Sequence, residues 1–217
     1  MILKSGLTGC IKMVYRDNIF SELPDMKNLI LLFALVMLIS CNSKKTLQSY
    51  SQLDTTYISR GNALAKLSFE TLSGELQRAL QTGGIDSALH YCNLRAYPIT
   101  DSLSLAHQAS IKRVSTKVRN PRNKADELAT FMMKGFGIDL SEGNTITPKL
   151  VLKDDSVLFF KPIVTQPLCL TCHGTPGKEV TFSTDASIQK LYPRDKAVGY
   201  KNNELRGLWR IAFKVKN

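Results

Sequence analysis

The C-terminal end of the chain alternates between apolar and polar side chains. In GLWRIAFKVK (207–216) the alternating sets are Trp209, Ile211, Phe213 and Val215 against Arg210, Ala212, Lys214 and Lys216. Successive side chains of a strand point to opposite faces, so the pattern predicts a strand with one buried side. Upstream, KLVLKDDSVLFFKPIV (149–164) predicts a hairpin that turns at Asp154-Asp155. The C-terminal half is therefore expected to form a mainly antiparallel sheet.

The N-terminal half follows a helical period instead. No proline occurs between Thr46 and Gln81, and leucines recur there three to five residues apart: Leu64, Leu67, Leu72, Leu76 and Leu80. This spacing predicts a long helix, which Gly83-Gly84 should end before a second helix that carries Cys92. Helices first and strands later predict an α+β fold, with an antiparallel sheet preceded by long N-terminal helices.

A further helix is expected between these two halves. Asn123 can cap a helix over residues 124–134, because a side-chain oxygen at this position accepts a hydrogen bond from a free backbone N–H. Gly135 and Gly137 follow directly and can close the helix. The sequence therefore predicts one short helix between the Cys92 helix and the hairpin.

An apolar segment near the N-terminus has the form of an export signal. In MKNLILLFALVMLISCNSKK (26–45), Lys27 precedes an unbroken apolar run over 29–39, and small Ser40 stands just before Cys41. The run is shorter than the roughly 20 residues that span a bilayer, so a cleaved signal fits better than a membrane helix. A buried core helix or an uncleaved anchor is the alternative, which the polar residues 42–45 disfavour.

This segment resembles a bacterial lipoprotein signal, and the resemblance implies cleavage before Cys41 and a lipid on that cysteine. Met26 is then the expected start, residues 1–40 form the signal region, 41–50 a lipid tether, and 51–217 one domain. Because several acyl chains hold a protein firmly, we expect a membrane-anchored lipoprotein with a periplasmic or cell-surface domain. The formal net charge of +11 can indicate nucleic-acid binding, but export makes nucleic acid an unexpected partner.

The sequence PLCLTCHGTPG (167–177) places Cys169 and Cys172 in a Cys-x-x-Cys pair that is followed directly by His173. Zinc, redox-dithiol and haem c chemistry all use such pairs. Structural zinc usually takes four protein ligands, and the chain offers no second paired motif. A thioredoxin-type dithiol sits where a strand leads into a helix, whereas residues 174–177 predict a loop. In an exported chain the motif favours haem c, with thioether bonds at both cysteines and iron ligation by His173.

A haem iron can accept a second axial ligand from the protein. The candidates are His90, Cys92, His107, Met132 and Met133. Helical spacing puts Cys92 on an apolar face, whereas His90, about 200° further round the helix, should point to water. Buried free cysteine is often only a small apolar residue, so ligand and core remain alternatives for Cys92. The methionines fit an amphipathic core segment, and His107 has no evident partner.

Five elements resemble, in the same order, a family of PAS-like domains that bind haem c. Such domains occur in cyanobacterial stand-alone proteins and at the sensing end of bacterial signal-transduction proteins. The elements are a helix with Ala88, Cys92 and Ala96, RNPRN (119–123), CLTCHG (169–174), YPRDKAVGY (192–200) and Arg206-Gly207. The match covers most of the chain from about residue 60. One departure is Asn202-Asn203, where the family often has glycine; asparagine tolerates positive φ, so we expect the turn to persist.

The resemblance implies a PAS-like antiparallel sheet and a covalent haem c at Cys169 and Cys172. It also implies that iron is ligated by His173 and, on the opposite side, by Cys92. The basic run IKRVSTKVRNPRNK (111–124) contains three arginines that can meet the haem propionates: Arg113, Arg119 and Arg122. The alternative is that the run is a solvated edge strand and loop. Arg119 is the strongest of the three candidates.

These observations predict a membrane-tethered c-type haem protein that acts as a redox or small-ligand sensor. A thiolate opposite histidine would stabilise ferric iron, and reduction would weaken the bond to Cys92. The alternative function is an electron-transfer c-type cytochrome lipoprotein, and either function needs a redox or signalling protein partner. The sequence has neither a serine, histidine and acid constellation nor paired carboxylates, so nothing in it indicates an enzyme. An open haem could still turn over peroxide if Cys92 were not a ligand.

Overall fold

The computed structural model describes the backbone of residues 42–215 and the side chains of residues 54–215. The expected signal region and Cys41 therefore lie outside the described residues. The chain divides into two compact units, Met1–Gln48 and Ser49–Asn217, and the second carries the features below. Among the helices of the described part, none combines the length and the apolar character that crossing a membrane requires.

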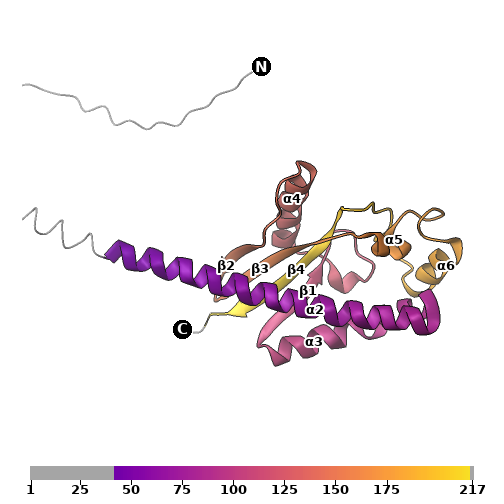
Figure 1. The fold of residues 1–217 in the computed structure, drawn as a ribbon, viewed down its shortest axis with the longest axis horizontal. Coiled ribbons are helices and arrows are strands. Elements are labelled where there is room, and N and C mark those ends of the chain that lie inside the picture. The colour runs from indigo at the N-terminus through magenta and orange to yellow at the C-terminus, as the bar shows by residue number, and fades with distance from the viewer. Residues whose placement is uncertain (1–41, 216–217) are drawn as a thin grey trace, which may run out of the picture. The chain divides into compact units, whose positions relative to one another are not determined.

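Figure 1 shows a long helix followed by shorter helices and the strands of a sheet. The elements are α2 (Asn42–Leu94), α3 (Ala96–Ala106), β1 (Ala109–Val114), the 3-10 helix η1 (Pro121–Asn123), α4 (Glu127–Ser141), β2 (Lys149–Lys153), β3 (Ser156–Val164), α5 (Pro167–His173), α6 (Phe182–Leu191) and β4 (Leu205–Lys214). The four strands form one antiparallel sheet in the order β1-β4-β3-β2. The predicted α+β class, an antiparallel sheet preceded by long N-terminal helices, is confirmed.

The predicted hairpin is also confirmed. β2 and β3 pair in antiparallel register from Lys153↔Ser156 to Lys149↔Phe160. The turn between them is Asp154-Asp155, and Asp154 takes a φ of 52°. Aspartate tolerates this left-handed conformation better than most residues, because its short polar side chain can hydrogen-bond to the nearby backbone.

Apolar side chains cover both faces of the sheet. On one face, α2 and α3 pack over Ile111, Phe159 and Ile211. On the other face, α4 packs over Leu158, Phe160 and Leu208. The predicted single buried side of the last strand therefore holds only for its second half, because α4 buries Leu208 completely on the opposite face.

Two glycine positions shape the long helix α2. A Cβ on Gly61 would collide with the ring of Phe159, so glycine lets the helix lie close against the sheet. Gly83 and Gly84 have non-helical backbone angles, with Gly84 at a φ of 65°. The predicted break at Gly83-Gly84 is confirmed, and residues 85–94, which include Cys92, form a separate helical segment.

The helix between the two halves differs from its prediction at both ends. Its N-cap is Asp126, whose Oδ1 accepts a hydrogen bond from the Ala129 N–H at 2.8 Å, and not Asn123. Asn123 instead accepts a hydrogen bond from the hydroxyl of Tyr97 at 2.7 Å. The helix also continues through both glycines to Ser141, because Phe136 between them is fully buried against the sheet. Burial of this apolar face outweighs the weak helix propensity of glycine.

Candidate functional site

A cavity of about 260 Å³ lies between α2, the sheet and α5. Five residues that the sequence singled out line it: Cys92, Arg119, Cys169, Cys172 and His173. The fold thus brings together residues that lie up to about 80 positions apart in the chain. Of the other candidate ligands, His90 and His107 are exposed, as predicted for His90, and Met132 and Met133 belong to the core beneath α4.

Helix α5 carries the Cys-x-x-Cys-His motif. It follows β3 and begins with Pro167, whose fixed φ suits the first helical turn. It ends where the Gly174 N–H donates to the Leu170 carbonyl at 2.8 Å. The expectation that the cysteine pair does not sit at a strand-to-helix junction is therefore wrong, although residues 174–177 do form a loop. Position alone does not separate dithiol from haem chemistry here.

The ring of His173 has a defined tautomer. Its Nδ1 lies 2.7 Å from the carbonyl oxygen of Ala197. A carbonyl oxygen can only accept, so Nδ1 carries the proton and Nε2 keeps a free lone pair. Such a bond from one ring nitrogen is the usual way of orienting a histidine whose other nitrogen binds a metal. Tyr200 packs edge-on against the ring, with centroids 6.3 Å apart at 88°.

The surroundings also keep His173 neutral. Burial, followed by the positive charges of Arg206 and Arg119, lowers the pKa of His173 well below its usual value. Although the residue as a whole is only half-buried, its ring faces the arginine-lined cavity rather than open solvent. Neutral imidazole is the form that binds metals. At neutral pH His173 is therefore ready to donate the Nε2 lone pair.

The segment Tyr192–Tyr200 holds α5 in place through backbone hydrogen bonds. The Tyr200 N–H donates to the His173 carbonyl at 2.9 Å, and the Gly199 N–H donates to the Gly174 carbonyl at 2.8 Å. Gly199 takes a φ of 73°, which favours glycine. The YPRDKAVGY motif thus acts mainly as a clamp on the His173 end of α5.

A buried ion pair connects this clamp to the RNPRN motif. The Nε and Nη2 of Arg119 donate to Oδ2 of Asp195 at 3.1 and 2.9 Å. The other carboxylate oxygen of Asp195 accepts from the Ala197 N–H at 2.8 Å. Nη2 of Arg119 also donates to the Cys172 carbonyl. Asp195 therefore fixes Arg119 and also, through the Ala197 N–H, the residue whose carbonyl orients His173. The sequence did not indicate this role beyond placing Asp195 in a recognised motif.

Two further arginines give the cavity a positive lining. Arg206 donates through Nη1 to Ser115 and to the Lys117 carbonyl, while its buried Nε has no hydrogen-bond partner in the described part of the chain. Arg113 forms no ion pair or hydrogen bond with any described residue. Arg122 does not line this cavity; its guanidinium lies over the ring of Tyr97, 3.9 Å from the centroid. Arg206 belongs to the Arg206-Gly207 element, for which the sequence alone indicates no function.

Cys92 faces the same cavity from α2. Burial raises the pKa of its thiol, and the nearby charge of Arg113 offsets part of this rise. Cys92, Cys169 and Cys172 are all free thiols. Within residues 54–215, no three histidine, cysteine or acidic side chains lie close enough together to hold a metal ion among themselves.

The turn before β4 keeps the geometry expected from asparagine. Asn203 takes a φ of 63°, which confirms that the turn persists without glycine at this position. Its N–H donates to the Thr165 carbonyl, and the Thr165 hydroxyl bonds to the Lys201 and Glu204 carbonyls. Further along, a Cβ on Gly207 would lie 2.5 Å from the Val114 carbonyl oxygen, so β4 approaches β1 closely beside the cavity.

Comparison with known proteins places the chain in a family. The crystal structure of the cyanobacterial heme-protein Tll0287 aligns with 70% of this chain and 95% of its own, at 21% sequence identity and a TM-score of 0.48. No curated protein matches the chain. A family model described as Tll0287-like matches residues 39–213, which is most of the chain. The protein therefore belongs to the Tll0287-like family.

Proposed function

We propose that the cavity holds a haem c, with thioether bonds to Cys169 and Cys172 and with His173 as an axial iron ligand. The observation that carries this proposal is the hydrogen bond from His173 Nδ1 to the Ala197 carbonyl. It leaves the Nε2 lone pair free to bind a metal, in a cavity that both thiols of the motif also line. The protein after which the family is named is described as a cyanobacterial heme-protein, which agrees with this assignment.

The residues of the cavity fit such a group. Haem carries two carboxylates, and Arg113 and Arg206 offer an unpaired guanidinium and a buried, unpartnered Nε beside the cavity. A porphyrin is larger than the cavity, so part of the group would stay exposed; Phe69 and Leu168, which line the cavity, are themselves 50% and 51% exposed. Arg119, the arginine favoured by sequence, is tied to Asp195 and is better suited to positioning α5 than to a carboxylate of the haem.

Cys92 is the proposed second axial ligand, and it gives the protein a sensing role. When bound, haem iron supplies one-electron redox chemistry and a binding site for diatomic gases. The buried environment of Cys92 raises the pKa of the thiol and so disfavours the free thiolate. A bond from Cys92 would therefore depend on the positive charge of ferric iron. Loss of this bond on reduction would release the helical segment 85–94, and this release is the proposed signal.

Absorption spectra of the protein, co-expressed with haem c maturation proteins, test the attachment. We expect covalent haem with two thioether bonds in the denatured pyridine sample. Cys169→Ser with Cys172→Ser should abolish covalent attachment, and His173→Ala should abolish the low-spin ferric spectrum. His107→Ala, a change at an exposed histidine outside the cavity, is the matched control. Full loss of haem in the control, or none in the cysteine variant, would contradict the proposal.

Cys92→Ala tests the sensing role separately. The variant should lose the thiolate-type ferric spectrum while its reduced spectrum stays close to that of the wild type. His90→Ala, two residues away and exposed, should leave both spectra unchanged. If Cys92→Ala alters neither redox state, Cys92 is not a ligand and the proposed switch is lost.

Electron transfer is the second candidate function, and the exposed rim favours it. Phe69 and Leu168 leave one side of the cavity open to a partner protein. An electron-transfer protein would keep Cys92 bound in both redox states and would exchange electrons rapidly. Stopped-flow reduction by small c-type cytochromes, followed at the haem absorption bands, separates the two functions.

We also propose that Cys41 carries a lipid and tethers the domain to a membrane, where a redox or signalling protein would meet it. The lipoprotein-like segment that ends at Cys41 supports this. Cells that express the full chain should place the protein in the membrane fraction. Cys41→Ala should move it to the soluble fraction, and retention of that variant in the membrane would contradict a lipid anchor.

A further inference from the structure

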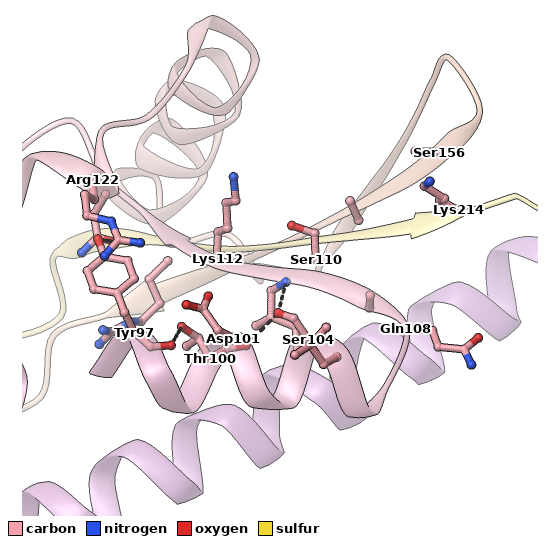
Figure 2. A pocket seen from close by; sticks show the side chains of 16 residues that line it. Tyr97, Thr100, Asp101, Ser104, Gln108, Ser110, Lys112, Arg122, Ser156 and Lys214 are labelled. Atoms are coloured by element: carbon pink, nitrogen blue, oxygen red, sulfur yellow. Dashed lines mark hydrogen bonds between the residues drawn. The ribbon is translucent and has the colours of Figure 1, made fainter. Parts of the chain in front are cut away.

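A second hollow, the α3–β1 groove, runs along the edge strand β1 and has a volume of about 870 Å³. Figure 2 shows Asp101 and Ser104, from α3, on one side of β1 and Ser110 and Lys112 on the other. Tyr97 and Arg122 lie at one end, and Ser156 and Lys214 lie towards the other. Of the residues proposed to hold the haem, Arg113 alone also lines this groove.

Small side chains from three strands line the groove: Ser110, Ala212 and Ser156. Ser110 of β1 pairs with Ala212 of β4, whose partner on β3 is Leu158; Ser156, the first residue of β3, pairs with Lys214, two positions further along β4. Towards the other end of the same sheet face, α4 covers the strands. Ala212 packs against the edge of this α4 cluster, whereas Ser110 is exposed, so the small residues form a floor beside the part of the sheet that α4 covers.

The wall that α3 contributes is fixed. The Ser104 hydroxyl donates to the Thr100 carbonyl at 2.7 Å and accepts from the Ile111 N–H at 2.9 Å. This contact ties α3 to the free edge of β1. At the end of the groove, stacking of Arg122 on Tyr97 and the Tyr97–Asn123 hydrogen bond hold a guanidinium in place. The groove is thus a formed surface and not a gap between loose elements.

Its charges are unbalanced. Four basic side chains line the groove, and none forms an ion pair with a described residue: Lys112, Arg113, Arg122 and Lys214. Asp101 is the one acidic residue that lines it. By contrast Arg210, the cross-strand neighbour of Lys112, is neutralised by Asp126 at 3.1 Å. The groove therefore concentrates positive charge that the rest of this sheet face does not share.

We propose that the α3–β1 groove binds a small organic anion, whose carboxylate or phosphate group is held by Arg122 and Lys112. Guanidinium groups match both anions with paired hydrogen bonds, and lysine adds a point charge. The groove volume falls within the roughly 300–1,000 Å³ of small-molecule sites, so a bare inorganic ion would fill little of it. Ser110, Ser156 and Gln108 supply polar contacts for the remainder of such a molecule.

Arg113 and Asn123 line both the groove and the cavity. An anion in the groove would therefore offset positive charge in the wall that the two share. This gives the ligand an electrostatic route to the wall of the cavity that Cys92 also lines. Binding itself does not require haem, so the test below holds whether or not the cavity is loaded.

Isothermal titration calorimetry of the purified full-length protein, at physiological ionic strength, tests the proposal. The probes are succinate, as the carboxylate source, and glycerol phosphate, as the phosphate source; glycerol is the neutral control. We expect one of the two anions to bind saturably at one site per chain and glycerol not to bind. The anion that binds identifies the class of ligand. Absence of saturable binding of both at millimolar concentration would overturn the proposal.

Three variants separate a shaped site from general attraction to a basic protein. Lys112→Gln with Arg122→Gln should weaken binding roughly tenfold or more, because two charge-assisted contacts are lost. Lys190→Gln, which removes one positive charge at an exposed lysine on α6, should leave the affinity unchanged. Ser110→Tyr fills the floor without altering charge and should abolish binding. Equal weakening by Lys190→Gln, or full affinity in Ser110→Tyr, would overturn the proposal.

Discussion

The cavity and the α3–β1 groove are both lined with arginine, but the two regions hold their charges differently. In the cavity, Arg119 is 10% exposed and is paired with Asp195, whose side chain is fully buried. In the groove, Lys112 and Lys214 are exposed and form no ion pair with a described residue. The folded chain therefore holds the charge of Arg119 in a fixed position in the cavity, and it leaves the two lysines of the groove free to meet a partner.

This difference indicates two kinds of task. A group that must hold iron needs ligands that are positioned before it binds, which requires buried supporting contacts. The chain from Arg119 through Asp195 and Ala197 to His173 supplies such support. A groove that admits and releases a small anion needs only accessible cations on a shaped surface. Substitutions in the two regions should therefore differ in their effect on stability.

The largest effect is expected at Asp195. Asp195→Ala removes the partner of Arg119 and leaves a nearly buried guanidinium unpaired, which typically costs about 3–5 kcal/mol. It also removes the acceptor of the Ala197 N–H, so the residue whose carbonyl orients His173 is held less firmly. Urea unfolding, followed by circular dichroism, measures the change in the free energy of unfolding. In the haem-loaded protein, the low-spin ferric spectrum should broaden or be lost.

The exposed pair Lys66–Glu70 provides the control for this prediction. Its side chains are 73% and 57% exposed, so Glu70→Ala should change the free energy of unfolding by less than about 1 kcal/mol. If Asp195→Ala costs no more than Glu70→Ala, the Arg119–Asp195 pair does not hold the cavity together.

The next effect concerns backbone shape at the end of α5. A Cβ on Gly174 would lie 2.6 Å from both the Leu170 carbonyl oxygen and the Glu179 Cβ. Gly174→Ala should therefore cost about 1–3 kcal/mol of unfolding free energy and disturb His173. Gly137→Ala, where a Cβ meets open space inside α4, should instead stabilise the protein by up to about 1 kcal/mol. Thermal unfolding of the two variants should show shifts of opposite sign, and shifts of the same sign would contradict this account.

The features predicted correctly from sequence are those set by neighbouring residues. Alternation in the second half of β4, the Asp154-Asp155 turn and the break at Gly83-Gly84 each depend on a few adjacent positions. The continuation of α4 past Gly135 was missed because burial of Phe136 depends on a sheet formed mostly by later residues. Local preference is a weak guide wherever tertiary packing decides.

The candidate site divides in the same way. The cysteine pair and His173 could be identified because the motif is contiguous, and Cys92 because its helix has a clear apolar face. The role of Asp195 could not be identified, because its partner Arg119 lies 76 residues away and no helical or strand periodicity connects the two positions. The one signal for such a role is that Asp195 is the acidic residue of the YPRDKAVGY motif in a chain with a net positive charge.

A smaller effect is expected at alkaline pH. Burial raises the pKa of Tyr192, beside the cavity, to about 12. In the unfolded chain this pKa lies near 10, so the unfolded state loses its proton first and stability should fall between about pH 10 and pH 12. Tyr192→Phe should make this fall less steep. Burial also raises the pKa of Tyr97, at the groove, but Arg122 and Arg113 oppose the rise. Tyr97→Phe should therefore flatten the curve less than Tyr192→Phe, and the reverse order in urea unfolding would contradict the comparison.

The smallest effect on stability is expected at Arg113, which lines both regions. Because Arg113 forms no ion pair with a described residue, Arg113→Gln should change the free energy of unfolding by less than about 0.5 kcal/mol. Arg119→Gln, the same change at a paired arginine of the same cavity, should cost several times more and leave Asp195 buried without its cation. Urea unfolding of the two variants at low and high salt measures both effects. A large cost for Arg113→Gln would mean that this side chain is held as firmly as Arg119. The wall that the cavity and the groove share would then be part of the fixed scaffold. An anion in the groove could not move the Arg113 side chain away from the cavity that Cys92 lines.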